Sequence, residues 1–313
     1  MEQVLAGLRA AGESTRLRLL FVLSHGEFNV TELTQILLQS QPRISRHLKL
    51  MTDAGLLERY KEGSWVVFRL REGGDVGRLA QMISGLLDKD DSVLRGDLKR
   101  LGDVVQERAQ QAADYFSRNA ANWDAIRNLH VSEAAVERAI LELAGDEKRE
   151  LLLDLGTGTG RVLELLAGKA EQAVGIDLSR DMLSMARANL AAAGLKNAQV
   201  RHGDIFSLPF DDGAADLVVV HQVLHYLDDP ARVLAEAARV LSSDGSLLIS
   251  DFAPHELEFL RDDHAHRRLG IADADMNRWL AKAGVRVVRQ EKLAPPGNGG
   301  KDGLTVSLWL ACR

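Results

Sequence analysis

The chain has 313 residues, of which 46% are hydrophobic and 27% charged, and this length allows two domains with a core each. No apolar run approaches the roughly 20 residues of a membrane helix, and the first residues lack the apolar stretch of a signal peptide. A single cysteine, Cys312, excludes an internal disulfide and a thiolate metal cluster. These features predict a cytoplasmic protein with no membrane contact and no bound metal.

The net charge of −6 is unevenly distributed along the chain. Residues 1–89 carry 12 Lys and Arg against 10 Asp and Glu, whereas the remaining residues carry 27 against 35. Within the first part, residues 39–71 hold seven basic side chains and three acidic ones. Taken alone, this basic stretch indicates either a binding site for a polyanion or a solvated helix face.

Two helices are expected first, over 17–23 and 33–37, because apolar residues recur there every three or four positions. Thr31 would cap the second of them. A third helix is expected over 43–51, with apolar residues spaced by four and three on its buried face. Its other face and Gln41, two residues before it, offer polar and basic side chains. We predict that these side chains contact DNA: Gln41, Arg43, Ser45, Arg46, His47 and Lys49.

Two β-type runs, 56–61 and 65–70, flank Gly63 and predict a hairpin. A helix, a turn, a polar-faced helix and a hairpin in this order form a winged helix-turn-helix. In that fold the second helix enters the major groove of double-stranded DNA and the wing reaches the backbone. Lys61 and Trp65 of the hairpin complete the predicted set of DNA contacts.

The segment LLQSQPRISRHLKLMTDAGLLERYKEGSWVVFRL, residues 37–70, resembles the DNA-binding core of the arsenic-repressor (ArsR) family of bacterial regulators. The resemblance implies a homodimer, joined through its terminal helices, on a palindromic operator. Many members sense metal through a Cys-Val-Cys pair, and Asn29-Val30-Thr31 stands at the matching place, so we expect no metal there. The alternative is an interaction domain that kept this fold and lost DNA binding.

A connector is expected over 90–114, where apolar residues from Leu94 to Val105 follow helical spacing and predict a dimer seam or a strut between domains. Tyr115, Phe116 and Trp123 follow, either as a lid over a ligand pocket or as core residues. The predicted organisation is therefore a DNA-binding domain over 1–89, a connector over 90–114 and a second domain over 115–313.

The run Leu151–Leu155 is continuously apolar, as a strand buried on both faces requires, and it leads into Gly-Thr-Gly-Thr-Gly at 156–160. Alternating strand and helix patterns up to residue 250 predict a parallel sheet, and the runs 285–293 and 304–311 predict an antiparallel pair. The expected fold class is α/β: an all-α winged helix-turn-helix followed by a Rossmann-like doubly wound sheet with an antiparallel last hairpin.

Sheets of this kind bind ligands at the carboxyl ends of their strands. Asp177 ends the second predicted strand, where a carboxylate accepts hydrogen bonds from ribose hydroxyls. The dinucleotide fingerprint requires glycine at the position that Arg161 occupies here, which argues against NAD.

The segments LLLDLGTGTGRVLELL, AVGIDLSRDML, VRHGDIFSLPF and ADLVVVHQVLHYLDDP together resemble the class I S-adenosylmethionine methyltransferases, especially those that methylate carbon or oxygen of small molecules. The resemblance implies S-adenosylmethionine or S-adenosylhomocysteine as cofactor, with Asp177 at the ribose, Asp204 at the adenine and His221 beside the sulfonium. The cofactor-binding residues that it implies are Asp154, Gly156, Thr157, Gly158, Gly160, Asp177, Leu178, Met182, Asp204, Ile205 and His221.

His221 and His225 are candidates for a catalytic base, although a lone histidine is more often structural. Arsenite methylation needs several thiolates, and the chain has one cysteine. Two hypotheses remain. In the first, the protein is a transcriptional regulator that senses S-adenosylmethionine or S-adenosylhomocysteine and controls methionine or methyl-cycle genes. In the second, it is an active methyltransferase with a small-molecule acceptor, and its DNA-binding domain is regulatory.

Overall fold

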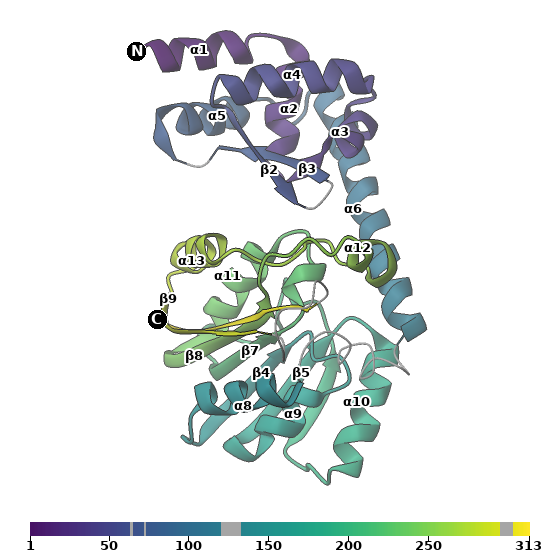
Figure 1. Ribbon diagram of the computed structural model, residues 1–313, viewed down its shortest axis with the longest axis vertical. Helices are drawn as coiled ribbons and strands as arrows, with labels where there is room; N and C mark the ends of the chain where they lie inside the picture. The colour runs from purple at the N-terminus through teal and green to yellow at the C-terminus, as the bar shows by residue number, and fades with distance from the viewer. Residues whose placement is uncertain (63–64, 72, 120–132, 295–302) are drawn as a thin grey trace. The chain divides into compact units, whose positions relative to one another are not determined.

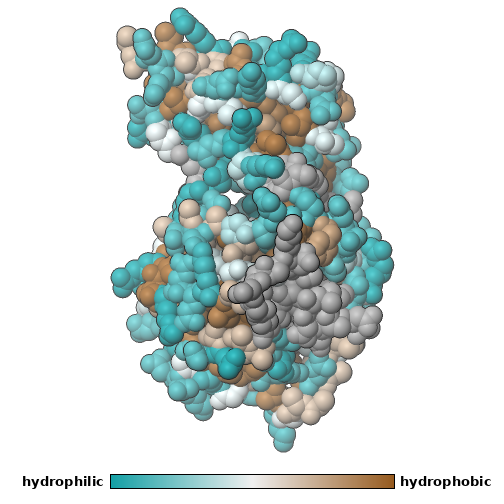
Figure 2. Space-filling view, in the orientation of Figure 1, coloured by the Kyte–Doolittle hydropathy of each residue, from teal (hydrophilic) through white to brown (hydrophobic). Residues whose placement is uncertain are grey.

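The computed structural model describes residues 1–62, 65–71, 73–119, 133–294 and 303–313. It contains two compact units, Met1–Gln111 and Ala112–Arg313 (Figure 1). Within the described ranges, no helix combines the length and the apolar character needed to cross a membrane. The side of the protein in Figure 2 is largely hydrophilic, with small hydrophobic areas between the polar side chains. The finer division at residues 89 and 114 stays a prediction.

The first unit is a group of helices with a small antiparallel sheet. Its helices are α1 (Glu2–Ala11), α2 (Ser14–Leu23), α3 (Val30–Leu37), α4 (Gln41–Asp53), α5 (Gly74–Leu86) and the first part of α6 (Ser92–Asn119). Its strands are β1 (Phe28–Asn29), β2 (Leu57–Glu62) and β3 (Trp65–Leu70), in the order β1-β3-β2. The predicted helix, turn, helix and hairpin are all present in this unit.

The helix α3 begins earlier than the apolar spacing predicts. Asn29 accepts a hydrogen bond from the Glu32 backbone at 3.0 Å, and the Glu32 carboxylate accepts one from the Asn29 backbone at 2.9 Å. This reciprocal pair is a capping box. The prediction that Thr31 caps the helix is therefore wrong, because Thr31 lies inside it and Asn29 satisfies the free backbone donors.

The helix α6 is one continuous element of 28 residues. It begins where the Asp91 carboxylate accepts hydrogen bonds from the backbones of Val93 and Leu94, at 2.8 and 3.1 Å. Leu101 and Val104 of its first part pack against the core of the first unit. Its last turns belong to the second unit, so α6 is shared by both units.

The described strands of the second unit form a seven-stranded sheet in the order β6-β5-β4-β7-β8-β10-β9. The strands are β4 (Arg149–Leu155), β5 (Ala170–Asp177), β6 (Ala198–His202), β7 (Ala215–His221), β8 (Leu241–Phe252), β9 (Arg286–Leu293) and β10 (Val306–Cys312). β4 to β8 pair in parallel, and β10 pairs antiparallel with both β8 and β9. This arrangement confirms the predicted α/β class with its antiparallel last hairpin.

Helices cover both faces of this sheet (Figure 1). Adjacent residues of one strand point to opposite faces, and accordingly Leu152 and Leu153 belong to different apolar cores. One core includes residues of α11 (Pro230–Val240) and α13 (Asp273–Lys282). The other includes residues of α8 (Glu133–Ala144), α9 (Arg161–Leu166) and α10 (Arg180–Ala192). Burial on both faces explains why these strands read as continuous apolar runs.

Candidate functional site

The glycine loop follows β4 at the carboxyl end of the sheet. Gly156 and Gly158 have φ angles of 73° and 53°, a left-handed backbone that glycine adopts at little cost. A Cβ atom on Gly156 would lie 2.5 Å from the Val223 side chain. Glycine is therefore required at 156 by the backbone conformation and by the close approach of Val223, in the segment that follows β7.

Asp177 ends β5 and holds this loop. Its Oδ2 accepts a hydrogen bond from the Gly158 backbone and its Oδ1 accepts one from the Ser179 backbone, both at 2.8 Å. Burial raises the pKa of Asp177, and these backbone donors work against that shift. Each carboxylate oxygen has two acceptor sites, so Asp177 keeps the capacity to accept further hydroxyl donors while it holds the loop.

Asp154, near the end of β4, binds Thr157 of the loop. Asp154 is 1% exposed, and its Oδ2 accepts a hydrogen bond from the Thr157 hydroxyl at 2.6 Å. A Cβ atom on Gly175 would lie 2.5 Å from that hydroxyl oxygen. The structure therefore gives both residues a role in shaping the loop, and their contact with a ligand stays a prediction.

The predicted adenine side lies at the ends of β5 and β6. The Gly203 backbone donates to the Asp177 carbonyl at 3.1 Å, which brings Asp204 to the same edge of the sheet as Asp177. Asp204 accepts a hydrogen bond from the Phe206 backbone at 2.9 Å. Leu178 is 60% exposed at this edge, whereas Met182 and Ile205 are buried.

His221 ends β7 and lines a small pocket beside the glycine loop. The other residues that line this pocket are Glu133, Val136, Glu137, Ile140, Arg161, Val162, Leu165 and Gln222. Arg161 donates to both carboxylate oxygens of Glu137, at 2.6 and 3.0 Å, and to Glu164 at 2.8 Å. The sequence reasoning used Arg161 only to argue against NAD and missed its place in the site, because its partner Glu137 lies 24 residues earlier.

His225 and Asp251 form a buried pair at the ends of β7 and β8. His225 lies in the short helix η3 (Leu224–Tyr226), and its Nδ1 is 2.7 Å from Asp251 Oδ1. The two side chains are 1% and 0% exposed. Asp251 also accepts hydrogen bonds from the backbones of Leu224 and Phe252. His225 Nε2 is buried and has no hydrogen-bond partner among the described residues.

The aromatic residues at the end of α6 pack near this pair. Tyr115 is 8% exposed, and its hydroxyl is 2.7 Å from His264 Nδ1. The Phe116 ring lies 4.8 Å from the Tyr226 ring, centroid to centroid. Burial raises the pKa of Tyr115 to about 12, with a smaller contribution from the charge of Asp263. Trp123, the third predicted member of this cluster, lies outside the described residues.

The solvent-facing side of α4 carries most of the predicted DNA contacts. Gln41, Arg43, Ser45, Arg46 and Lys49 are exposed. His47 differs, because its side chain is 14% exposed and its Nδ1 lies 3.9 Å from a Glu13 carboxylate oxygen. In the hairpin, Lys61 is exposed and Trp65 is the first residue of β3.

Several charges act on His47. Burial lowers its pKa, the Glu13 carboxylate acts in the opposite direction, and the positive charges of Arg16, Arg43 and Arg46 lower it further. His47 is therefore mainly neutral at pH 7, and the positive charge on this face comes from the arginine and lysine side chains. Arg16, in the first turn of α2, is a basic residue on this side that the sequence reasoning missed.

The described residues contain no group of three or more His, Cys, Asp or Glu that could hold a metal ion. The lone Cys312 pairs with Ser246 in the β10–β8 register, and the parallel strand β8 runs from there to Phe252. Cys312 therefore lies toward the amino ends of the parallel strands, at the opposite edge of the sheet from the glycine loop.

Two family models match the chain. Residues 13–59 match "Bacterial regulatory protein, arsR family", and residues 153–249 match "Methyltransferase domain". The predicted combination of an ArsR-type helix-turn-helix with a methyltransferase domain is thereby confirmed.

Curated relatives resemble the second part of the chain. "Uncharacterized methyltransferase YcgJ" of Bacillus subtilis is 29% identical over 106 residues, which span 34% of this chain and 42% of that protein. "Demethylmenaquinone methyltransferase" of Thermus thermophilus is 34% identical over 143 residues, 44% of this chain and 64% of that protein. Each of these matches covers less than two thirds of the relative.

Solved structures show the same fold. A chain from the complex that contains the Haloferax volcanii Trm112 methyltransferase activator is 22% identical, with a TM-score of 0.53 and coverage of 64% of this chain and 98% of that chain. Geranyl diphosphate C-methyltransferase from Streptomyces coelicolor, solved with S-adenosyl-L-homocysteine, is 14% identical, with a TM-score of 0.50 and coverage of 58% and 77%.

Proposed function

We propose that this chain, which joins an ArsR-type helix-turn-helix to a methyltransferase domain, is a transcriptional regulator whose second unit binds S-adenosylmethionine or S-adenosylhomocysteine. Binding of either cofactor changes the affinity of the first unit for a palindromic operator in double-stranded DNA. Genes of methionine synthesis or the methyl cycle are the targets that such an effector suits.

One observation carries the cofactor assignment: Asp177 at the end of β5 holds the glycine loop through the Gly158 backbone while keeping acceptor capacity. In our proposal Asp177 takes the ribose hydroxyls, Asp204 takes the adenine amine and His221 lies beside the sulfonium. Gly156, Gly158 and Gly160, shaped by Asp154 and Thr157, let the backbone approach the methionine part. The apolar side chains of Leu178, Met182 and Ile205 lie on the adenine side.

A homodimer is supported by the apolar surface of the first unit. Gly7 of α1 packs against Leu79 of α5, so that these two helices adjoin. On them Leu5 and Leu8 are 44% and 47% exposed, and Met82 and Leu86 are 60% and 84% exposed. Apolar side chains exposed on neighbouring helices favour a protein–protein contact, and a second copy of this chain is the partner that a palindromic operator requires.

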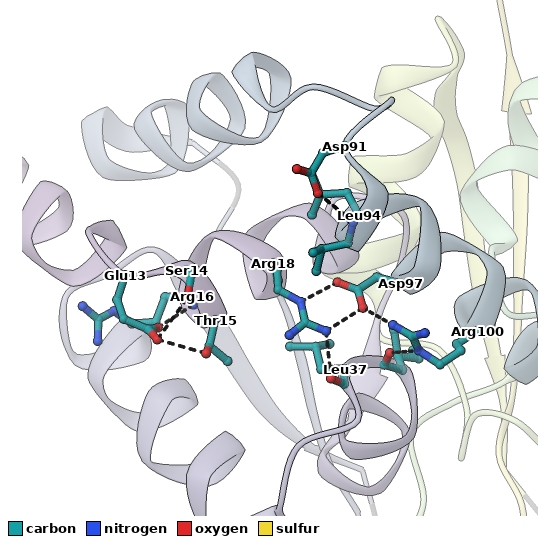
Figure 3. Close-up of polar contacts among 12 residues, drawn as sticks. Glu13, Ser14, Thr15, Arg16, Arg18, Leu37, Asp91, Leu94, Asp97 and Arg100 are labelled. Atoms are coloured by element: carbon teal, nitrogen blue, oxygen red, sulfur yellow. Dashed lines mark hydrogen bonds and ion pairs between the residues drawn. The ribbon is translucent and has the colours of Figure 1, made fainter.

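The helix α6 offers a physical route for the coupling between the units. Its first part is tied to the first unit by Asp97, a fully buried carboxylate that binds Arg18 and Arg100 (Figure 3). Its last turns place Tyr115 and Phe116 against His264 and Tyr226 of the second unit. A ligand that shifts these aromatic contacts therefore acts on a helix that the first unit also holds.

The test is DNA binding with and without each cofactor. Duplexes selected by the protein from a random-sequence library serve as the operator, at fixed salt because DNA affinity depends strongly on salt. We expect one cofactor form to change the affinity about 5- to 150-fold, the usual range of allosteric coupling. A DNA affinity that is the same without cofactor and with either cofactor at saturation would refute the sensor function.

A second candidate function is methyl transfer to a small molecule, and the His225–Asp251 pair favours it. If Asp251 accepts the Nδ1 proton of His225, the other ring nitrogen carries a lone pair and can take a proton from the acceptor. The acceptor atom would then bond to the methyl carbon as the carbon–sulfur bond breaks, leaving S-adenosylhomocysteine. Positioning supplies most of the rate in such a displacement.

This second function predicts labelled product when the protein is mixed with a metabolite extract and S-adenosylmethionine carrying a labelled methyl group. His225→Gln should lower kcat by about 100-fold or more, the usual contribution of a general base, while cofactor affinity stays unchanged. Product formed at the wild-type rate by His225→Gln would show that the pair is structural.

A further inference from the structure

The Glu13 carboxylate has contacts in α2 and in α4. Glu13 precedes α2 and caps it: Oε2 accepts a hydrogen bond from the Arg16 backbone and Oε1 accepts one from the Thr15 hydroxyl, both at 3.0 Å (Figure 3). The side chain is 29% exposed. These contacts satisfy free donors at the helix start, which is the ordinary task of a capping residue.

The same carboxylate also faces α4, the predicted recognition helix. Arg43 Nη2 lies 3.6 Å from Glu13 Oε1, and His47 Nδ1 lies 3.9 Å from Glu13 Oε2. Arg43 Nη2 also donates to the Thr15 hydroxyl at 3.2 Å. Glu13 and Thr15 therefore hold two of the predicted DNA-contacting side chains against the start of α2.

The charge of Glu13 has a consequence beyond capping. Burial tends to raise the pKa of Glu13, but the hydrogen bonds from Thr15 and Arg16 lower it overall, and His47 adds to this effect only when it is protonated. Glu13 is therefore ionised at neutral pH. Uncharged serine or asparagine caps a helix equally well, and a carboxylate beside the basic recognition helix repels the DNA phosphates.

We propose, on the basis of the DNA-binding function above, that Glu13 is a positioning residue that sets the specificity of operator binding. In free protein it holds Arg43 and His47 toward α2. DNA that engages Arg43 Nη2 competes with its Glu13 contact, and a duplex replaces this contact when it offers an acceptor at the right place. Random DNA lacks this acceptor and meets the Glu13 charge instead, so that the carboxylate acts as a repulsive element against wrong sequences.

The substitution Glu13→Gln separates the two roles of this residue. The glutamine amide oxygen can still accept from the Arg16 backbone, so the cap is kept, while the charge that holds Arg43 is removed. The experiment measures affinity over a series of salt concentrations for a random-sequence duplex and for a duplex selected by the wild-type protein from a random library.

We expect Glu13→Gln to bind the random duplex about 5- to 10-fold more tightly at low salt. The plot of log affinity against log salt should become steeper by about 0.9, the value for one additional phosphate contact. The ratio of affinities for selected and random duplexes should fall. If Glu13 served only as a helix cap, Glu13→Gln would at most change the thermal stability. The affinity ratio and the salt slope would then equal those of the wild type.

Asp75→Asn is the matched control. It removes the same charge from the same unit, in α5, where Asp75 pairs with Arg78 at 2.6 Å. We expect its salt slope and affinity ratio to equal those of the wild type. If Glu13→Gln has the salt slope and the affinity ratio of the wild type, the proposed role of Glu13 is overturned and the DNA-binding function is not. Absence of DNA binding by the wild-type protein would instead overturn the DNA-binding function, and this inference with it.

Discussion

Arg18 of α2 and Asp97 of α6 form a two-point ion pair in which Arg18 Nε and Nη2 donate to the two carboxylate oxygens, both at 2.7 Å. Asp97 is fully buried. Arg18 Nη2 also donates to the Leu37 carbonyl at 2.8 Å, and Arg100 Nε donates to the Ile36 carbonyl at 2.5 Å. These carbonyls end α3 immediately before the turn into α4, so α6 holds the end of α3 at the start of that turn.

Asp97→Asn should destabilise the first unit and weaken the response of DNA binding to cofactor. Removing one partner of a buried ion pair leaves the other charge uncompensated, at a cost of about 3 kcal/mol. Chemical denaturation followed by circular dichroism measures the first effect, and DNA affinity with and without cofactor measures the second. An unchanged unfolding midpoint, with a full cofactor response, would show that this pair is dispensable.

Asp177→Asn should abolish cofactor binding while the second unit stays folded. Burial raises the pKa of Asp177 above its ordinary value, so ionising this group in the folded protein costs free energy at neutral pH, and that cost is absent for the neutral amide. The amide oxygen can still accept from the Gly158 or Ser179 backbone. The other backbone donor loses its acceptor, which offsets this gain. Calorimetry with S-adenosylhomocysteine should detect no heat, while circular dichroism shows a folded second unit. Tight binding by this variant would refute the ribose assignment.

Tyr115 should ionise at a pH of about 12, about two units above an ordinary tyrosine. Because its folded pKa is raised, its contribution to stability is complete below the unfolded value near 10 and is lost as the pH rises from about 10 to about 12. Ultraviolet difference titration of wild type and Tyr115→Phe isolates this group. If one tyrosine fewer titrates near pH 10 in Tyr115→Phe than in the wild type, Tyr115 has an ordinary pKa and is exposed.

Cys312→Ser should leave cofactor binding and any methyl transfer unchanged. Cys312 lies across from Ser246 at the far edge of the sheet from the glycine loop, and its sulfur is 3.7 Å from the Ser246 hydroxyl. Parallel assays of wild type and variant with a labelled methyl group test this expectation. Loss of transfer in the variant would show that this thiol takes part in the reaction.

The sequence was sufficient to predict the central strands β4 and β7 of the second unit, because strands buried on both faces are continuous apolar runs. The glycine loop and Asp177 were predictable for the same reason, since each directly follows such a run. In the first unit, the apolar spacing of α3 and α4 and the short turn between them predicted the helix-turn-helix. These features depend on residues that are close together in the chain.

The side-chain pairs that shape the sites were not predictable from local pattern. Arg18 and Asp97 are 79 residues apart, and Tyr115 and His264 are 149 residues apart. Such contacts follow from packing, which brings distant segments together, and no short motif encodes them. The prediction that Arg43 is exposed is confirmed, but its contact with Glu13, 30 positions earlier in the chain, was not predictable for the same reason.

The most direct test of the central claim measures the coupling from the cofactor side. The affinity of the protein for S-adenosylmethionine and S-adenosylhomocysteine is determined by calorimetry, with and without a saturating selected duplex. Because coupling is reciprocal, DNA must change the cofactor affinity by the same factor by which cofactor changes the DNA affinity. We predict that these two factors are equal and that they differ from one. Cofactor affinity that does not change when DNA is bound would contradict the account.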